Sequence, residues 1–346
     1  MASIPEITVG FPVYNVEKYV YRSLKSVLDQ NFEDFEVLVI DDCGSDKSME
    51  VIRELIANHP NGHKVRIIKH EQNAGLAQAR NTAIKNSRSK YIYFLDSDDY
   101  IRRDALSTLY ETAEKYQTDV VFSSNYKQQG DRIWVEDKDI LPSIQFLKDG
   151  EFTSYLYSNV KDFMPNTVWN ILFNMDFLAK NNLLFPNIRY QEDIAFNELY
   201  HPCIKKAAFI PNKTYYYIIR TDSLMNKTAR SSIGIHEAKR AIELCTLLKN
   251  SCSKWKEEPF YGGKCAKVLR RCFMQVTGIL KHRELFEGNI SDKDIRDMIK
   301  HPDSLFHILK FNQLILYNLQ FYILGVLPPT LSVFLIKIVC KKKKFI

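Results

Sequence analysis

Three carboxylates stand within four positions of one another, directly after an apolar run. Asp96, Asp98 and Asp99 follow residues 91–95, which read Tyr-Ile-Tyr-Phe-Leu. Such a run is typical of a strand buried on both faces of a sheet. Acids this close repel one another, and two interpretations are open. They form a polar turn that begins the next helix, or they hold a hard divalent cation, Mg²⁺ or Mn²⁺, beside a substrate phosphate.

Two predicted strands upstream also end in side chains that could bind a ligand. Residues 7–13 run into Tyr14, and residues 35–40 run into Asp41 and Asp42. The carboxyl ends of parallel strands meet at one edge of a sheet, where open α/β folds bind their ligands. We therefore expect one crevice to collect all three strand ends.

The elements that position these side chains alternate between strand and helix. Apolar patterns predict strands over 7–13, 35–40, 65–69, 91–95 and 119–123, separated by helices of about a dozen residues. This order predicts an α/β fold with a mostly parallel sheet and right-handed crossovers. No G-x-G-x-x-G or Walker A loop accompanies it, so a metal is expected to carry the charge of any bound phosphate.

Five motifs in this order resemble the family 2 glycosyltransferases, the inverting enzymes with a GT-A fold, of the bacterial surface-polysaccharide type. The resemblance covers about residues 5–220. It rests on Phe-Pro-Val-Tyr-Asn at 11–15, the strand that runs into Cys-Gly-Ser-Asp at 43–46, Asn-Ala-Gly-Leu-Ala-Gln-Ala-Arg-Asn at 73–81, the acids at 96–99, and Glu192-Asp193. Cys43 is a departure, because relatives usually read Asp-Asp-Gly-Ser without an inserted residue, and this puts the pose of Asp42 in doubt.

The resemblance implies a nucleotide-sugar site. Tyr14, beside Pro12, would stack on the base, and Asp42 would accept a hydrogen bond from the uracil N–H. Arg80 would help to hold the base or the diphosphate. Read alone, these residues also fit a turn aromatic, a helix cap and a solvated helix charge.

The resemblance also assigns the acids. Asp96 and Asp98 are similar to the D-x-D pair that shares ribose and metal, with Asp98 and Asp99 as the candidate ligands of Mn²⁺ or Mg²⁺. Glu192 would bind the nucleotide-sugar. The pattern leaves open which carboxylate touches the metal.

Asp193 is the expected catalytic base. Inversion at the anomeric carbon needs one group to take the proton of the acceptor hydroxyl during in-line attack, and a carboxylate can do so. Glu192 and Asp193 at the start of a predicted helix are also a favourable capping arrangement, so a structural role is the alternative.

The acceptor side is expected between residues 131 and 219. Its aromatic side chains suit sugar stacking but are equally ordinary core residues, and core is favoured for most of them; they are Trp134, Trp169, Tyr190 and the tyrosines at 215–217. The expected catalytic domain is 1–225, divided into a nucleotide-sugar half at 1–125 and an acceptor half at 126–225. A helical C-terminal region at 226–346 follows it.

The C-terminal region ends in an uncharged, apolar stretch and a lysine cluster. Residues 311–336 carry no charge, Pro328 and Pro329 interrupt them, and four lysines follow at 341–344 within a chain of net charge +7. This pattern predicts two helices within 311–336 that lie on an anionic membrane surface, with 305–346 as the membrane-associating region. A helical appendage packed on the catalytic domain or on a second subunit is the alternative, so a homo-oligomer stays open.

The expected activity is transfer of a sugar from a UDP-sugar to a hydroxyl of a glycan or lipid-linked oligosaccharide in surface-polysaccharide biosynthesis. A nucleotidyltransferase and a catalytically inactive nucleotide-sugar or glycan-binding module are the alternatives. The basic cluster follows an apolar segment, so no nucleic acid partner is expected. Seven scattered cysteines without a CxxC pair favour reduced thiols and a cytoplasmic protein. With the C-terminal pattern, the expected location is peripheral, on the cytoplasmic face of the inner membrane.

Overall fold

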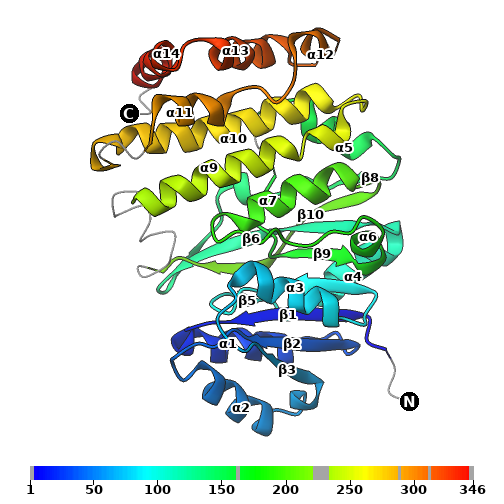
Figure 1. Cartoon of the computed structure of the whole chain (residues 1–346). Coiled ribbons are helices and arrows are strands. Elements are labelled where there is room, and N and C mark those ends of the chain that lie inside the picture. Colours follow the sequence, from blue (N-terminus) through cyan, green and yellow to red (C-terminus); the bar gives the residue numbers. More distant parts are fainter. Residues whose placement is uncertain (1–3, 161–163, 221–233, 287–289, 311–312, 343–346) are drawn as a thin grey trace. The chain divides into compact units, whose positions relative to one another are not determined.

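The computed structural model describes residues 4–160, 164–220, 234–286, 290–310 and 313–342 (Figure 1). The chain divides into two compact units. The first comprises residues 1–152 and 165–220, and the second comprises 153–164 and 221–346. The boundary expected at residue 225 lies outside the described residues. Residues 153–164 belong to the helical unit although they precede the end of the first unit in the chain. The sequence analysis did not predict this, because nothing in the sequence of that segment indicates it.

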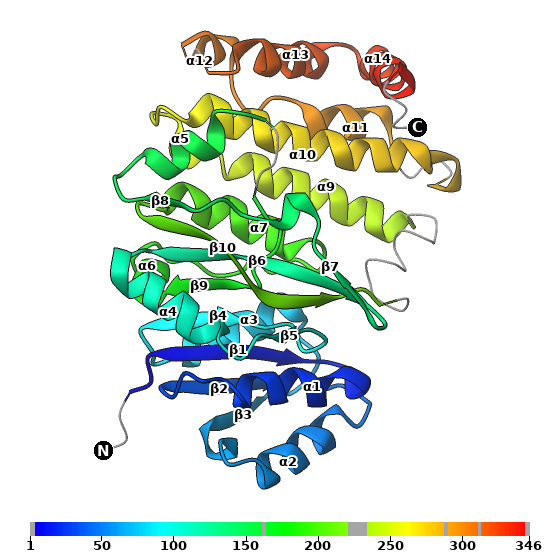
Figure 2. The same ribbon diagram turned by 180° about the vertical axis from the view of Figure 1, so that it is seen from behind.

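The first unit is built on a sheet whose first four strands pair in parallel, as predicted. They are β1 (Ile7–Val13), β2 (Phe35–Asp41), β3 (Val65–Lys69) and β4 (Tyr91–Phe94). The helices between them are α1 (Glu17–Leu28), α2 (Ser48–Asn58) and α3 (Leu76–Asn86), and α4 (Ala105–Tyr116) follows. Figure 2 shows the same arrangement from behind. The parallel pairing brings the carboxyl ends of β1, β2 and β4 to one edge.

Beyond β4 the sheet is mixed rather than mostly parallel. Its strand order is β3-β2-β1-β4-β9-β6-β10-β5. The added strands are β5 (Tyr100–Ile101), β6 (Val120–Gln129), β7 (Arg132–Trp134), β8 (Ile144–Phe146), β9 (Ile171–Asn174) and β10 (Ala207–Ile218). Strand β9 is antiparallel to both β4 and β6. The start of β9 therefore lies beside the end of β4, where the acids at 96–99 begin.

Both faces of the parallel strands are covered. The apolar stripe of α1 (Val20, Leu24, Val27 and Leu28) is fully buried against alternate residues of β1, β2 and β4. Gly10 belongs to the opposite face, where an added Cβ would lie 3.1 Å from Ala83 of α3 and 3.0 Å from the Phe94 ring. The missing side chain at this position thus lets α3, which carries Arg80, approach the sheet closely.

Two shorter helices complete the first unit, α6 (Met175–Lys180) and α7 (Glu192–Tyr200). Helix α5 (Glu151–Tyr157) begins at the end of residues 1–152, and the rest of it belongs to the second unit. Helix α7 begins at Glu192, so the sequence motif at 192–193 forms its first turn.

The second unit is helical in its described residues, as expected. Its helices are α9 (Ile235–Asn250), α10 (Tyr261–Lys281), α11 (Asp292–Ile299), α12 (Leu305–Lys310), α13 (Ile315–Val326) and α14 (Pro329–Lys342). The apolar stretch forms two helices that separate at Leu327 and Pro328, which confirms the predicted break at the prolines. Among the described helices none combines the length and the apolar character that a bilayer crossing needs.

Candidate functional site

Loops after β1, β2 and β4 bring the predicted nucleotide-sugar residues to one edge of the sheet. Pro12 is a buried residue of β1. Tyr14 follows that strand, and its side chain is 49% exposed, so a ring face is open to a base. Two hydrogen bonds join this loop to the loop after β2: Ser45 N–H donates to Asn15 Oδ1 at 2.8 Å, and Glu17 N–H donates to an oxygen of Asp46 at 2.8 Å.

Asp42 is buried and organises the loop that leads into α3. One of its oxygens accepts hydrogen bonds from Ala74 N–H at 2.8 Å and from the His70 ring at 2.7 Å. The other accepts from Gly75 N–H and the Asn73 amide, both at 2.9 Å. A carboxylate offers about four lone-pair sites, and all are used here. The expected uracil contact does not fit this arrangement, and Asp42 is a residue that shapes the site.

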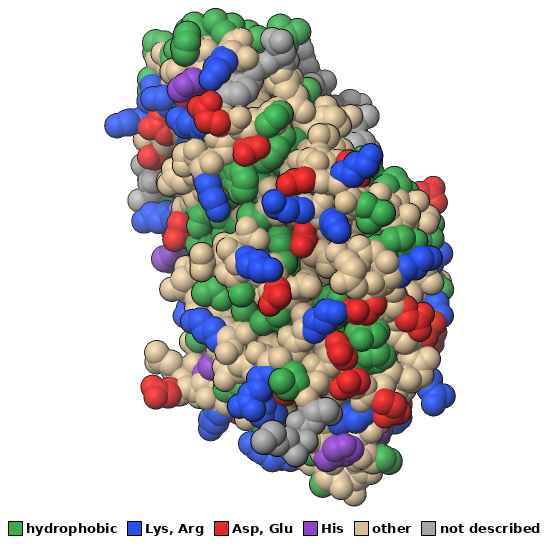
Figure 3. All heavy atoms as spheres, turned by 90° about the vertical axis from the view of Figure 1, so that its right-hand side faces the viewer, with side chains coloured by type: hydrophobic (Ala, Val, Ile, Leu, Met, Phe, Trp, Pro, Cys, Tyr) green, Lys and Arg blue, Asp and Glu red, His purple; other side chains and the backbone are tan. Residues whose placement is uncertain are grey.

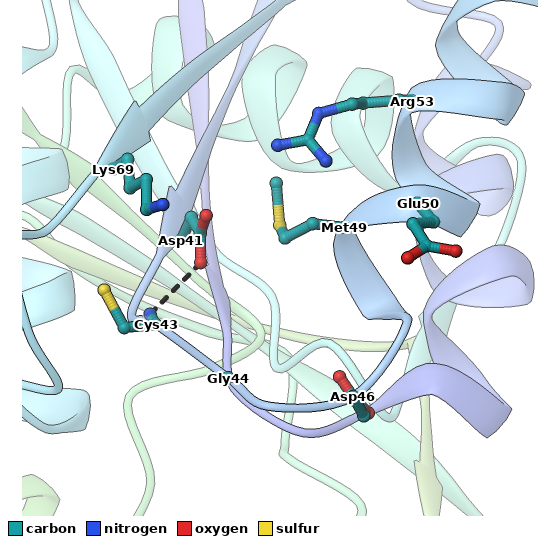
Figure 4. A pocket seen from close by; sticks show the side chains of 8 residues that line it. All are labelled: Asp41, Cys43, Gly44, Asp46, Met49, Glu50, Arg53 and Lys69. Carbon is teal, nitrogen blue, oxygen red and sulfur yellow. Dashed lines mark hydrogen bonds between the residues drawn. The ribbon is translucent and has the colours of Figure 1, made fainter.

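Cys43 sits in the left-handed conformation, with φ of 57°. Its thiol donates to the carbonyl of His70 at 2.9 Å, and its N–H donates to Asp41 Oδ1 at 3.1 Å. Cys43 therefore forms a tight turn that leaves Asp42 buried. It also borders a cavity of about 270 Å³, lined by Asp41, Cys43, Gly44, Asp46, Met49, Glu50, Arg53 and Lys69 (Figure 4). No sequence pattern indicated this cavity.

Arg80 of α3 is fully buried and binds three of the predicted acids. Its Nη2 donates to Asp96 Oδ1 at 2.8 Å, and its Nη1 donates to Glu192 Oε1 at 3.1 Å and to Asp193 Oδ1. We call Arg80, Asp96, Glu192 and Asp193 the arginine cage. Two of its acids lie more than 110 positions from Arg80 in the sequence, and the fold brings all four together.

Two contacts position Arg80 and its neighbour Asn81 against Phe185, in the segment before α7. Its guanidinium lies 5.4 Å from the centre of the Phe185 ring. The next residue, Asn81, is buried and exchanges two hydrogen bonds with the backbone of Phe185, at 2.9 and 2.8 Å. Asn81 thus clamps α3 to the loop before α7, a role that its place in the motif did not reveal.

One positive charge faces three negative charges in the arginine cage, and this imbalance decides the proton affinities. Burial alone would lower the pKa of Arg80, but the charges of Asp193, Asp96 and Glu192 outweigh it and raise that pKa. Burial is the largest effect on Asp193, and the charges of Glu192 and Asp96 add to it. Together they exceed the opposing effect of Arg80 and raise the pKa of Asp193 to about 8. A carboxylate with a raised pKa is suited to take up a proton near neutral pH.

Asp98 pairs with an arginine that the sequence analysis missed. Arg220 Nη2 lies 2.7 Å from Asp98 Oδ2, and these side chains are 17% and 22% exposed. The Arg220 guanidinium also lies 4.9 Å from the centre of the Tyr19 ring. Arg220 follows β10 by two residues and belongs to no recognised motif, so only the fold identifies it.

Asp99 was expected to bind metal, and the structure contradicts this. Its side chain is 2% exposed, with one oxygen accepting from Tyr215 OH and the other from Ile218 N–H, both at 2.7 Å. Burial, followed by the charges of Asp98 and Asp96, raises the pKa of Asp99 well above its usual range. The two hydrogen bonds of Asp99 link the acidic turn to β10.

The remaining acids suit a metal that is shared with a substrate. In the described parts of the chain no group of three His, Cys, Asp or Glu side chains is arranged to hold an ion. Mg²⁺ in nucleotide sites, however, commonly uses one or two carboxylates and takes its other ligands from phosphates and water. Asp96 and Asp98, with side chains 24% and 22% exposed, provide oxygens of that kind.

Comparisons with known proteins agree with this geometry. Residues 8–189 match the family model for glycosyl transferase family 2. Glycosyltransferase EpsJ of Bacillus subtilis, described as uncharacterized, is 30% identical over 239 residues, which cover 68% of each chain. The poly(ribitol-phosphate) beta-N-acetylglucosaminyltransferase TarS of Staphylococcus aureus is 25% identical over 221 residues, covering 63% of this chain and 36% of TarS.

The crystal structure of S. aureus TarS 1–349 in complex with UDP-GlcNAc has the same fold. It superposes with a TM-score of 0.65 at 20% identity and covers 92% of this chain and 88% of that one. This confirms the expected fold class, GT-A with a helical C-terminal region.

Proposed function

Because the chain belongs to the family 2 glycosyltransferases, we propose that it transfers a sugar from a UDP-sugar, with inversion, to a hydroxyl of a glycan or lipid-linked oligosaccharide in surface-polysaccharide biosynthesis. The arginine cage is the observation that carries this proposal. It places the expected base, Asp193, in contact with the same guanidinium as Asp96 of the D-x-D pair. The solved complexes of TarS with UDP and UDP-GlcNAc support the choice of donor.

The proposed reaction uses Asp193 as the single base. The acceptor hydroxyl gives its proton to Asp193 and attacks the anomeric carbon, while the bond from that carbon to the diphosphate oxygen breaks and UDP departs. Arg80 holds Asp193 in place, because it donates to Asp193 and to Glu192 beside it. The guanidinium of Arg80 is fully buried, and its low-dielectric surroundings strengthen its interactions with these carboxylates.

Asp98 and Asp96 are the residues that would hold a Mn²⁺ or Mg²⁺ ion. When bound, such an ion supplies positive charge to the departing diphosphate. Arg220 neutralises Asp98 in the structure. An ion at Asp98 would leave the Arg220 guanidinium available to the phosphates, so we assign Arg220 to the donor site as well.

A titration of nucleotides by calorimetry tests this proposal. UDP, UDP-glucose, UDP-galactose and their N-acetyl forms are titrated with and without Mn²⁺, with GDP and CDP as controls. We expect Mn²⁺-dependent binding of UDP that Asp98→Ala abolishes, and retained binding in Asp176→Ala, whose carboxylate is 84% exposed on α6. Absence of uridine nucleotide binding under every metal condition contradicts the proposal.

We also propose that the enzyme acts as a peripheral protein on the cytoplasmic face of the membrane, docked through α12–α14. Ten large hydrophobic side chains in these helices are exposed; they are Leu305, Phe306, Leu309, Leu316, Ile323, Val326, Leu331, Phe334, Ile338 and Val339. Hydrophobic side chains are visible at the upper end of the face in Figure 3, where α12 lies. An apolar surface of this kind marks an interaction site.

The charge of the same segment selects lipid rather than a second copy of the chain. Residues 304–346 contain six lysines and no Asp or Glu, although the whole chain has a net charge of only +7. Two such surfaces would repel each other, whereas anionic headgroups attract each lysine by about 1 kcal/mol. The acceptor would then be presented at the surface to which the enzyme is bound.

Vesicle sedimentation tests the docking. We expect binding to phosphatidylcholine vesicles that contain phosphatidylglycerol, weaker binding to phosphatidylcholine alone, and release by salt. The double variant Phe306→Ser/Phe334→Ser should bind at least tenfold less, and Met274→Ser on α10, which is 47% exposed, should bind normally. A stable oligomer by light scattering together with no vesicle binding contradicts the docking and favours a second copy.

A further inference from the structure

A stack of three aromatic rings lies at the same edge of the sheet as the D-x-D acids. The Trp169 ring is parallel to Tyr215 and Tyr217, with centroid distances of 4.4 and 5.6 Å and interplanar angles of 14° and 8°. Trp169 and Tyr217 are only partly buried, and both pack against the core of the first unit. We call these three residues the aromatic shelf.

Strand pairing brings the start of β9 beside the end of β4. In this antiparallel pair, Tyr91 faces Asn174 and Tyr93 faces Leu172. Asp96 follows β4 by two residues and Trp169 precedes β9 by two, so both chain segments leave the sheet at this edge. Asp99, three residues after Asp96, accepts a hydrogen bond from Tyr215 OH at 2.7 Å, so the shelf is attached to the acidic turn itself.

Electrostatics support the same placement. Burial raises the pKa of Tyr217, and the charges of Asp99, Asp98 and Asp96 raise it further. These acids therefore lie near the Tyr217 ring.

The turn that carries Trp169 is fixed by its neighbour Asn170, which adopts a left-handed conformation with φ of 60° and is 2% exposed. The Asn170 amide donates to the carbonyls of Ser123 and Ser124, both at 2.9 Å. Its oxygen accepts from Ser123 Oγ at 2.9 Å, Thr214 Oγ1 at 2.7 Å and Tyr93 OH at 3.3 Å. Five hydrogen bonds to three strands therefore hold this turn in one conformation and fix the position of Trp169.

We propose that the aromatic shelf, through its partly exposed members Trp169 and Tyr217, binds the acceptor sugar that receives the transferred residue. A pyranose presents a face of C–H groups, and rigid aromatic rings offer apolar area to it with little loss of conformational entropy. Trp169 belongs to the half of the first unit that follows the nucleotide loops, and it lies on the side of the acids away from Tyr14 in strand order. This inference rests on the proposed glycosyl transfer and adds the position of the acceptor.

The chain contains a matched control on the other side of β10. Tyr216 points opposite to its two neighbours and stacks between Tyr100 and Tyr126, with centroid distances of 4.4 and 4.8 Å. Arg22 lies 4.4 Å from the centre of the Tyr100 ring. Removal of Tyr216 therefore deletes an aromatic stack of similar geometry that does not touch the shelf.

Kinetics with defined acceptors test the shelf. The probes are 4-nitrophenyl glycosides of glucose, galactose and their N-acetyl forms, with the UDP-sugar found by calorimetry as donor. We expect Trp169→Ala to raise the KM for the accepted glycoside at least tenfold, and Trp169→Phe to raise it less than threefold. UDP affinity and slow donor hydrolysis should stay within twofold in both variants and in Tyr216→Ala, which should also keep its acceptor KM.

The outcomes separate this inference from the proposed function. Wild-type protein that binds no uridine nucleotide defeats the proposed function itself. If the wild type binds UDP but Trp169→Ala keeps the acceptor KM of the wild type, only the proposed role of the aromatic shelf is contradicted. The shelf also fails if Trp169→Ala loses UDP affinity and thermal stability together, because Trp169 is then a core residue, or if saturation-transfer NMR with UDP present detects no glycoside on the wild type.

Discussion

Two arginines pair with the two carboxylates of the D-x-D motif, Arg80 with Asp96 and Arg220 with Asp98, and the two arginines differ in burial. Arg80 is fully buried and is shared among Asp96, Glu192 and Asp193. Arg220 is 17% exposed and pairs with Asp98 at the end of the described part of the first unit. A buried guanidinium shared by three acids is a permanent component, because its removal leaves uncompensated buried charge. Arg220 is partly exposed, so a change of its partner leaves less buried charge uncompensated than a change at Arg80 does. The first arginine therefore shapes the catalytic centre, and the second suits a group that responds to the donor.

Asp193→Asn breaks the chemistry of the arginine cage without changing its shape. Asparagine can still accept from Arg80, but it cannot take a proton, so turnover should fall by about 10²–10⁴. UDP affinity measured by calorimetry should be nearly unchanged. Asp176→Asn, an exposed acid on α6, is the matched control, and a mutant Asp193 enzyme with most of its turnover would sink the assignment.

Arg80→Gln breaks the cage itself. Three carboxylates then share a buried site without a cation, and we expect the free energy of unfolding to fall by about 3–5 kcal/mol. Urea denaturation measures the change, with Arg53→Gln on the exposed side of α2 as the control that stays within about 0.5 kcal/mol. Equal stability of the two variants would show that the cage contributes nothing to folding.

The pH dependence of activity sharpens the comparison, because the arginine cage contains a group, Asp193, that titrates near neutrality. With a pKa of about 8, Asp193 is protonated at lower pH, so kcat should rise up to tenfold per pH unit toward pH 8 and then level off. The stability effect has the opposite sign. Between the usual Asp pKa near 4 and pH 8 the native state binds more protons than the unfolded state, so the contribution of Asp193 to stability falls as pH rises.

Asp193→Asn serves as the reference for this profile. The residual activity of the variant should lose the rise below pH 8. An unchanged profile in the variant assigns the titration to another group.

Arg220→Gln should have the smallest effect. Loss of one charged hydrogen bond to the diphosphate corresponds to about tenfold weaker UDP binding, while uridine, which lacks phosphates, should bind as before. Mn²⁺ alone should bind more tightly, because Asp98 no longer carries a counter-ion; electron paramagnetic resonance of free Mn²⁺ measures this. Equal affinities for both ligands in variant and wild type would make Arg220 a purely structural residue.

Sequence reasoning found the elements because they follow from local patterns, and it found most residues of the arginine cage through the family resemblance. The strand at 7–13 and the helix face with Val20 and Leu24 appear where apolar spacing places them. Strand-end acids meet at one edge because parallel pairing leaves no alternative. Asp193 was joined to them only through the family resemblance.

The assignments of Asp99, Asp42 and Arg220 depended on partners that are distant in the sequence, and residue spacing does not reveal such partners. Asp99 was assigned to a metal, but a turn sends adjacent side chains in different directions, and Tyr215 is 116 positions away. Asp42 was assigned to uracil, but the loop at 73–75 saturates its oxygens. Arg220 lies in no motif, and its role is visible only where β10 ends beside the acidic turn.

The central claim is that Asp193 is the single base that deprotonates the acceptor hydroxyl, which then attacks the anomeric carbon on the face opposite the departing UDP. Proton NMR of the product formed from an α-linked UDP-sugar and a 4-nitrophenyl glycoside tests it directly. A β-linked product, visible as a large coupling at the new anomeric proton, is the predicted result. An α-linked product would contradict the single-base account, because retention requires a second displacement that the arginine cage does not provide.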